Sequence, residues 1–156
     1  MHTISAEECE VHTINKDEAR QFYAENSFVA FKEAYGIYGL KYNDELVLCM
    51  QSNIVGRCLS LCNICFKIGV DVMDALQKVI KHTLKSYDKV QIAIDRRLWP
   101  RSILDGVSYA SITYTQPNKH FCIGKLKDSL VDELSENDAK SLHYTICDSG
   151  DIIVNI

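Results

Sequence analysis

The sequence predicts a single domain of mixed α/β fold whose sheet is mostly antiparallel. Residues 89–94 alternate apolar and other side chains, which is the period of a strand with one buried face. Residues 71–86 instead repeat apolar side chains at helical spacing, and a helix between two strands implies that those strands are parallel. Apolar runs on both sides of Asn43-Asp44 predict an antiparallel hairpin. We therefore expect Val90–Ile94 to be central and parallel to Cys58–Phe66.

The N-terminal half is predicted to hold four strands and one helix. Asn15 is in position to cap the helix, with Glu18 three residues later as in a capping box. The predicted elements, in order, are a strand over Cys9–Ile14, a helix to about Asn26, strands over Tyr35–Tyr42 and Glu45–Met50, a loop over Ser52–Arg57 and a strand over Cys58–Phe66.

In the C-terminal half, Asp71 is predicted to cap the crossover helix, with Asp74 in its first turn. The elements that follow are the strand Val90–Ile94, a short helix from Pro100 to about Asp105, strands over Val107–Thr115 and His120–Ile123, a helix over Lys125–Glu136, and a hairpin of His143–Asp148 with Ile152–Ile156. The expected architecture is a sheet with helices on both faces, followed by a C-terminal helix plus hairpin.

Charge and hydropathy exclude some classes of protein. The net charge is −4, which argues against a general DNA-coating protein, since such proteins need a surplus of Lys and Arg. No apolar run approaches the roughly 20 residues of a membrane span, and the N-terminus lacks the pattern of an export signal. We therefore expect a protein of the cytoplasm with no membrane partner.

Seven cysteines are present, and three of them follow one another as Cys58, Cys62 and Cys65. This spacing superficially resembles a metal knuckle, but it lies in a predicted strand. Regular alternation places Cys58 and Cys62 on one face and Cys65 on the other, so that the three thiolates do not converge on one tetrahedral ion. We expect buried, reduced thiols and no metal site.

The polar cluster Asp95-Arg96-Arg97 directly follows the strand Val90–Ile94. Ligands commonly bind at the carboxyl ends of strands in open α/β sheets, and this cluster offers a carboxylate and two guanidinium groups. A surface ion-pair cluster that closes the strand is the competing interpretation. Lys78, Lys81 and Lys85 share one helix face and allow the same two readings, a basic strip or a solvated face.

Short motifs along nearly the whole chain resemble, in their order, those of one known family. They are Glu25-Asn26-Ser27, Gly39-Leu40-Lys41-Tyr42, Glu45-Leu46-Val47, Leu61-Cys62-Asn63, Val72-Met73-Asp74-Ala75-Leu76, Asp95-Arg96-Arg97-Leu98, Val107-Ser108-Tyr109, Pro117-Asn118-Lys119-His120-Phe121-Cys122 and Ile146-Cys147-Asp148-Ser149-Gly150. The family is the C-terminal domain of many phage-encoded proteins, often appended to homing-type endonucleases. Its layout is similar to the GNAT acetyltransferase fold and to phage Mom-type DNA-modifying proteins, so the resemblance implies a GNAT-like sheet.

The resemblance also locates a cofactor loop at Val72, Met73, Asp74 and Ala75. In a GNAT fold a glycine-rich turn lets backbone N–H groups approach the pyrophosphate of coenzyme A at a helix N-terminus. The family's two glycines are Met73 and Asp74 here, so a side chain obstructs the approach and an acid repels the phosphate. We therefore expect no cofactor, and acetyl-CoA only if the protein is an enzyme.

Two functions follow from the resemblance. The first is a catalytically degenerate GNAT-like protein of phage type, a binding, accessory or host-counteracting factor whose partner is a host or phage protein or a nucleic acid. The alternative is an acyl-CoA-dependent N-acyltransferase, including one that modifies nucleic acid, with Asp95 and a tyrosine such as Tyr109 or Tyr114 handling protons. The tyrosines also suit the core of a strand. Arg96, Arg97 and His120 are the candidate partner-binding residues.

Overall fold

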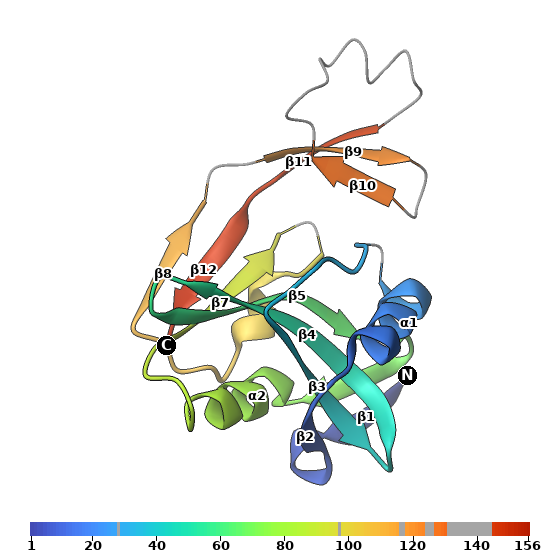
Figure 1. Ribbon diagram of the computed structural model, residues 1–156, viewed down its shortest axis with the longest axis vertical. Coiled ribbons are helices and arrows are strands. Elements are labelled where there is room, and N and C mark those ends of the chain that lie inside the picture. The colour runs from blue at the N-terminus through green and yellow to red at the C-terminus, as the bar shows by residue number, and fades with distance from the viewer. Residues whose placement is uncertain (28, 97, 116–117, 124–126, 131–144) are drawn as a thin grey trace.

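The computed structural model describes the chain except for residues 28, 97, 116–117, 124–126 and 131–144 (Figure 1). Its main feature is a mixed sheet in the order β2-β3-β4-β5-β7-β12-β8. The strands are β2 (Glu10–Thr13), β3 (Gly36–Tyr42), β4 (Glu45–Val55), β5 (Cys58–Phe66), β7 (Val90–Asp95), β8 (Ser111–Tyr114) and β12 (Asp151–Asn155). All neighbouring pairs are antiparallel except β5 and β7.

The predicted centre of the sheet is confirmed. Strand β7 lies between β5 and β12, and it runs parallel to β5 with Leu59 opposite Val90 and Leu61 opposite Ile92. The connection between the two parallel strands contains helix α2 (Ala75–Thr83), as the crossover rule requires. The fold class predicted from the periodicity, a mixed and mostly antiparallel sheet, is therefore correct.

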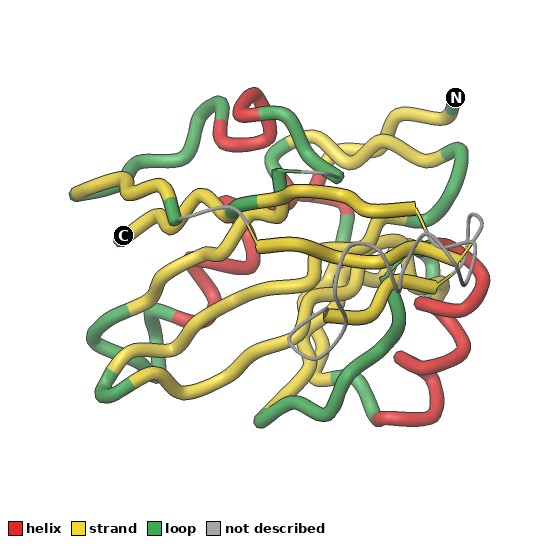
Figure 2. Tube along the Cα trace, turned by 90° about the horizontal axis from the view of Figure 1, so that it is seen from above, coloured by secondary structure: helices red, strands yellow, loops and turns green. Residues whose placement is uncertain are grey.

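Helices cover both faces of the sheet, and they lie well apart on the flanks of the molecule (Figures 1 and 2). Helix α1 (Lys16–Asn26) begins after Asn15, whose side chain accepts a 2.9 Å hydrogen bond from the Glu18 N–H as predicted. Its Ala19, Phe22 and Tyr23 pack in a buried cluster with strand residues such as Cys49 and Cys65. Among the described residues, the other helical elements are the short 3-10 turns η1 (Ala6–Glu8) and η2 (Arg101–Leu104).

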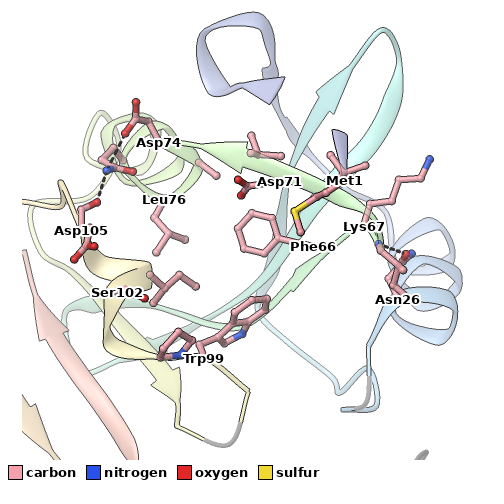
Figure 3. Close-up of a pocket in the computed structure, with 17 residues that line it drawn as sticks. Met1, Asn26, Phe66, Lys67, Asp71, Asp74, Leu76, Trp99, Ser102 and Asp105 are labelled. Carbon is pink, nitrogen blue, oxygen red and sulfur yellow. Dashed lines mark hydrogen bonds between the residues drawn. The ribbon is translucent and has the colours of Figure 1, made fainter. Parts of the chain in front are cut away.

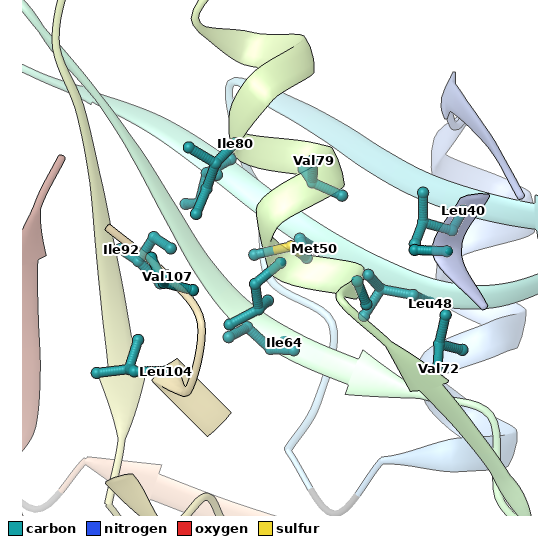
Figure 4. Packing of buried hydrophobic residues seen from close by; sticks show 14 of the residues in the cluster. Leu40, Leu48, Met50, Ile64, Val72, Val79, Ile80, Ile92, Leu104 and Val107 are labelled. Atoms are coloured by element: carbon teal, nitrogen blue, oxygen red, sulfur yellow. The ribbon is translucent and has the colours of Figure 1, made fainter. Parts of the chain in front are cut away.

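The larger hydrophobic core lies under α2 (Figure 4). Val79 and Ile80 of the helix pack in one cluster with Leu48, Met50 and Ile92 from the sheet. None of the helices in the described part of the chain combines the length and the apolar character that a membrane crossing needs.

The predicted start of the crossover helix is wrong. Residues Val70–Met73 form strand β6, which pairs in parallel with β1 (His2–Ser5), and α2 starts only after Asp74. Asp71 is therefore a strand residue and caps no helix. The partner of β6 is strand β1, far earlier in the sequence, so no local pattern predicts this strand.

The C-terminal region also departs from the prediction. Residues Lys127–Leu130 form strand β10 where a helix was expected, and the remainder of that predicted helix, residues 125–126 and 131–136, lies outside the described residues. The expected hairpin does not form, because β11 (Thr145–Ser149) pairs with β9 (Asn118–Ile123) while β12 pairs with β7 and β8. Ser149-Gly150 was predicted as a hairpin turn. Gly150 instead separates two strands that belong to different sheets.

Candidate functional site

Strands β5 and β7 pair over only three residues each and then part. The pairing covers Leu59–Leu61 and Val90–Ile92, although β5 continues to Phe66 and β7 to Asp95. A β-bulge in β5 lies just beyond this point: Cys62 is opposite Gln51 and Cys65 is opposite Cys49, so Asn63 and Ile64 share one partner residue. Asn63 has φ +48, which accommodates the irregular step.

Two side chains from distant elements bind the successive carbonyl oxygens of the bulge. The buried Tyr23 hydroxyl of α1 donates to the carbonyl of Asn63 and, at 3.3 Å, to that of Cys49. The Trp99 indole N–H donates to the carbonyl of Ile64 at 3.3 Å. Burial raises the pKa of Tyr23, so its hydroxyl stays protonated and remains a donor at alkaline pH as well. The opening between β5 and β7 is therefore a built feature of the fold.

The bulge also corrects the prediction for the cysteines. One extra residue reverses the alternation of β5, so Cys65 packs against α1 with Cys49, on the face opposite to Leu59, Leu61 and Ile64. Cys65 therefore shares the face of Cys58 and Cys62. The five described cysteines, Cys9, Cys49, Cys58, Cys62 and Cys65, are free, and the described residues contain no group arranged to hold a metal ion.

A cavity of about 570 Å³ lies beside this opening, between the end of β5, the start of α2 and the segment after β7 (Figure 3). Its apolar wall includes Phe66, Leu76 and Trp99, whose side chains face the same space. The rings of Phe66 and Trp99 contact each other edge-on, with centroids 5.4 Å apart. An apolar cavity with polar groups at one end is the usual form of a small-molecule site.

The N-terminus of α2 opens onto this cavity. Asp74 has φ +61 and ψ 22, a left-handed conformation that glycine adopts most easily, and its side chain does not cap the helix. No described residue accepts from the N–H groups of Ala75, Leu76 or Gln77. The turn before α2 therefore has a backbone shape that favours glycine, although Asp74 occupies it, and the helix presents N–H donors without a described acceptor at its positive end.

The N–H groups at the start of α2 favour an anion, whereas the charged side chains around the cavity repel one. The lining includes the exposed carboxylates Asp71, Asp74 and Asp105. The only lysine or arginine among the described lining residues is Lys67, and its ammonium group pairs with Glu45. The carboxylates repel an anion, although solvent and salt reduce the effect because all three are exposed.

The structure brings together only part of the predicted site. Val72, Asp74 and Ala75 of the predicted cofactor loop line the cavity, whereas Met73 is 53% exposed and does not. Asp95 ends β7 opposite Asp151 and does not line the cavity either.

The remaining predicted residues lie elsewhere. Tyr109 is exposed and hydrogen-bonds Arg101, which raises the pKa of that guanidinium, and the Arg96 guanidinium lies over the Tyr114 ring at 5.7 Å. Arg97 lies outside the described residues, and His120 lies on β9 of a separate sheet. The sequence therefore did not show that Phe66, Trp99 and Asp105 share a site, although Trp99 is the only tryptophan and could have drawn attention.

The sequence matches no protein-family model and no curated protein. Solved structures do match. The ribosomal-protein-S18-alanine N-acetyltransferase from Escherichia coli has 9% identity and a TM-score of 0.56, over 95% of this chain and 92% of that one. A GNAT family acetyltransferase from Elizabethkingia anophelis, solved with acetyl-CoA bound, has 14% identity and a TM-score of 0.46 over 96% and 97%. The IAA acetyltransferase from Bacillus cereus has 10% and 0.44 over 95% and 99%. The fold is GNAT-like, and at these identities the likeness concerns the fold alone.

Acetyl-CoA is the cofactor that this fold implies, and the described site can be compared with it. The free N–H groups of Ala75, Leu76 and Gln77 suit a diphosphate, and the apolar cavity suits the arm that carries the thioester. The three exposed carboxylates oppose the phosphates without closing the cavity. The backbone arrangement therefore suits a diphosphate, whereas the charges around it oppose one.

Proposed function

We propose that the protein is a GNAT-like acyltransferase that transfers an acyl group from acyl-CoA to an amino group. The observation that carries this proposal is the uncapped N-terminus of α2, which opens onto the cavity where β5 and β7 part. The fold shared with an N-acetyltransferase supports it. Coenzyme A, when bound, supplies the acyl group as an activated thioester.

Each part of the site has a task in this proposal. The N–H groups of Ala75, Leu76 and Gln77 bind the diphosphate. Phe66 and Trp99 exclude water from the inner part of the cavity, where a thioester would otherwise hydrolyse. Asp95 stays the candidate proton acceptor that the sequence suggested, although it does not line the cavity. It ends β7 and begins the turn that leads to Trp99, whose backbone N–H donates to the Asp95 carbonyl at 3.1 Å.

Calorimetric titration with acetyl-CoA tests the proposal. We expect weak binding by the unmodified protein and binding about fivefold tighter by Asp74→Gly, since this change removes a negative charge beside the phosphates. Asp44→Gly is the matched control: Asp44 also has a positive φ, +65, and lies in the β3–β4 turn away from the cavity. Its titration should equal that of the unmodified protein.

Two other results would contradict the proposal or its phosphate site. If neither the unmodified protein nor Asp74→Gly binds acetyl-CoA at about 1 mM, the acyltransferase proposal fails. Equal gains from Asp74→Gly and Asp44→Gly would show that the start of α2 is not the phosphate site. Release of free coenzyme A in the presence of an amine then tests transfer itself.

The acidic lining favours a second candidate function. Asp71, Asp74 and Asp105 surround the place where phosphates would bind, as expected of a GNAT-like protein that has lost catalysis and binds a partner instead. This candidate corresponds to the phage-type binding or accessory factor, active in the host cytoplasm on a protein or a nucleic acid. Tight acetyl-CoA binding by the unmodified protein would exclude it, whereas no binding by any variant would favour it.

A further inference from the structure

A second hollow borders the same helix and belongs to no function considered so far. It has a volume of about 580 Å³ and lies between α2 with the turn after it and the segment of residues 6–11. We call it the α2 groove, and its charged lining residues are Glu7, Glu10, Asp74, Lys78, Lys81 and Lys85, with His82 beside them. It shares only Asp74 and Gln77 with the cavity of the candidate site.

One wall of the α2 groove is cationic. Lys78, Lys81 and Lys85 follow one another at spacings of three and four residues, so they form a row about 10 Å long on one side of the helix and its last turn. Lys78 Nζ lies 3.5 Å from the Glu7 carbonyl, which holds it at the groove. In the part of the chain that the structure describes, no carboxylate is within ion-pair distance of Lys81 or Lys85.

The other wall is an edge of the sheet. It contains Glu7 of η1 and Glu10 and Val11 of β2, and β2 is the first strand of the main sheet, paired with β3 alone among the described strands. An edge strand has unpaired backbone groups along one side, and extended peptides bind to such edges by adding a strand. The α2 groove therefore combines a row of three lysines, two of them without a carboxylate partner among the described residues, with an edge strand.

We propose that the α2 groove binds an extended segment of a partner protein that carries acidic residues at alternate positions. Every second side chain of an extended peptide points to the same side. The acidic ones can thus contact Lys78, Lys81 and Lys85, while uncharged ones face Glu7 and Glu10. A nucleic acid fits less well, because its charge is negative at every residue and half of the groove is acidic. This inference does not depend on the acyltransferase proposal.

Fluorescence anisotropy with a labelled peptide of alternating Thr and Glu tests the proposal at low ionic strength. We expect saturable binding that weakens as salt is added, and about tenfold weaker binding by Lys81→Ala/Lys85→Ala. The matched control is Lys16→Ala/Arg20→Ala, which removes two positive charges from exposed positions of α1, outside the groove. Thermal melting of both variants checks that the fold is retained.

Four results would overturn the proposal. The first is no binding of the alternating peptide at about 1 mM. The second is equal binding of a peptide with the same composition whose glutamates stand in one block, because the extended register would then be irrelevant. The third is tighter binding of a labelled single-stranded oligonucleotide, which would identify the lysine row as a phosphate site. An equal loss in the two double variants would also contradict it.

Discussion

Gly106 shows how one residue holds the candidate site together. It lies after Asp105 with φ +80, next to the start of α2. Gln77 donates to the Asp105 carbonyl at 3.0 Å and to the Asp74 carboxylate at 3.3 Å, so a single amide links the segment after β7 to the helix. A Cβ atom at position 106 would lie 2.7 Å from Gln77 Nε2, so an alanine there must displace the link.

We predict that Gly106→Ala lowers the free energy of unfolding by about 2 kcal/mol, from backbone strain and from the displaced amide. Gly69→Ala is the control, since Gly69 has φ +81 with nothing within 4 Å of its added Cβ. That variant should lose only about 1 kcal/mol, the cost of the left-handed conformation. Urea denaturation measures the free energy of unfolding of both variants. Equal losses would show that the contact with Gln77 does not contribute to stability.

At the level of elements, the decisive feature is the bulge in β5. Tyr23 from α1 and Trp99 from the segment after β7 bind its two carbonyls, so two elements that are far apart in sequence hold the same irregularity. The bulge reverses the alternation of β5, and it lies at the point where β5 leaves β7. The bulge therefore shapes the opening beside the candidate site.

Tyr23→Phe should lower the free energy of unfolding by about 1–2 kcal/mol, because it removes the buried hydroxyl that bonds the carbonyls of Asn63 and Cys49. Tyr114→Phe removes a hydroxyl from a side chain that is 49% exposed and should cost nearly nothing. Chemical denaturation of both variants checks this difference. An unchanged stability of Tyr23→Phe would mean that the tyrosine does not support the bulge.

For the whole molecule, stability at high pH depends on the core beneath α1. Cys49 and Cys65 face each other there, and burial raises the pKa of each thiol from 9.0 to about 12. Above pH 9 the unfolded chain loses these protons while the folded protein keeps them. Ionisation therefore favours the unfolded state, and the contribution to stability is lost as the pH rises from about 9 to 12.

We predict that Cys49→Ala/Cys65→Ala lowers stability at pH 7 by leaving space in the core, and that its stability falls less steeply than that of the unmodified protein above pH 9. Lysines, the other tyrosines and the other cysteines titrate in both proteins, so the difference between the two curves reports the two thiols together with their effect on the neighbouring Tyr23. Denaturation midpoints across this range measure it. Parallel curves would contradict the assignment.

Local signals were sufficient where an element depends on its own residues. The cap at Asn15, the turn at Asn43-Asp44 and the alternation of Val90–Ile94 predicted α1, the first hairpin and the central strand, because capping, turn formation and one-sided burial act within a few residues. The predicted cofactor loop came from the family resemblance and not from a local signal. Its Val72, Asp74 and Ala75 line the cavity, and their role in binding a cofactor stays a prediction.

Tertiary structure decided everything that depends on a distant partner. Strand β6 exists because β1 pairs with it, the bulge in β5 persists because Tyr23 and Trp99 bind it, and the strands on either side of Gly150 separate because β7 and β9 are available. The cavity combines β5, α2 and the segment after β7 for the same reason. Periodicity reports which face of an element is buried, but the choice of a neighbour depends on the summed contacts of the whole chain.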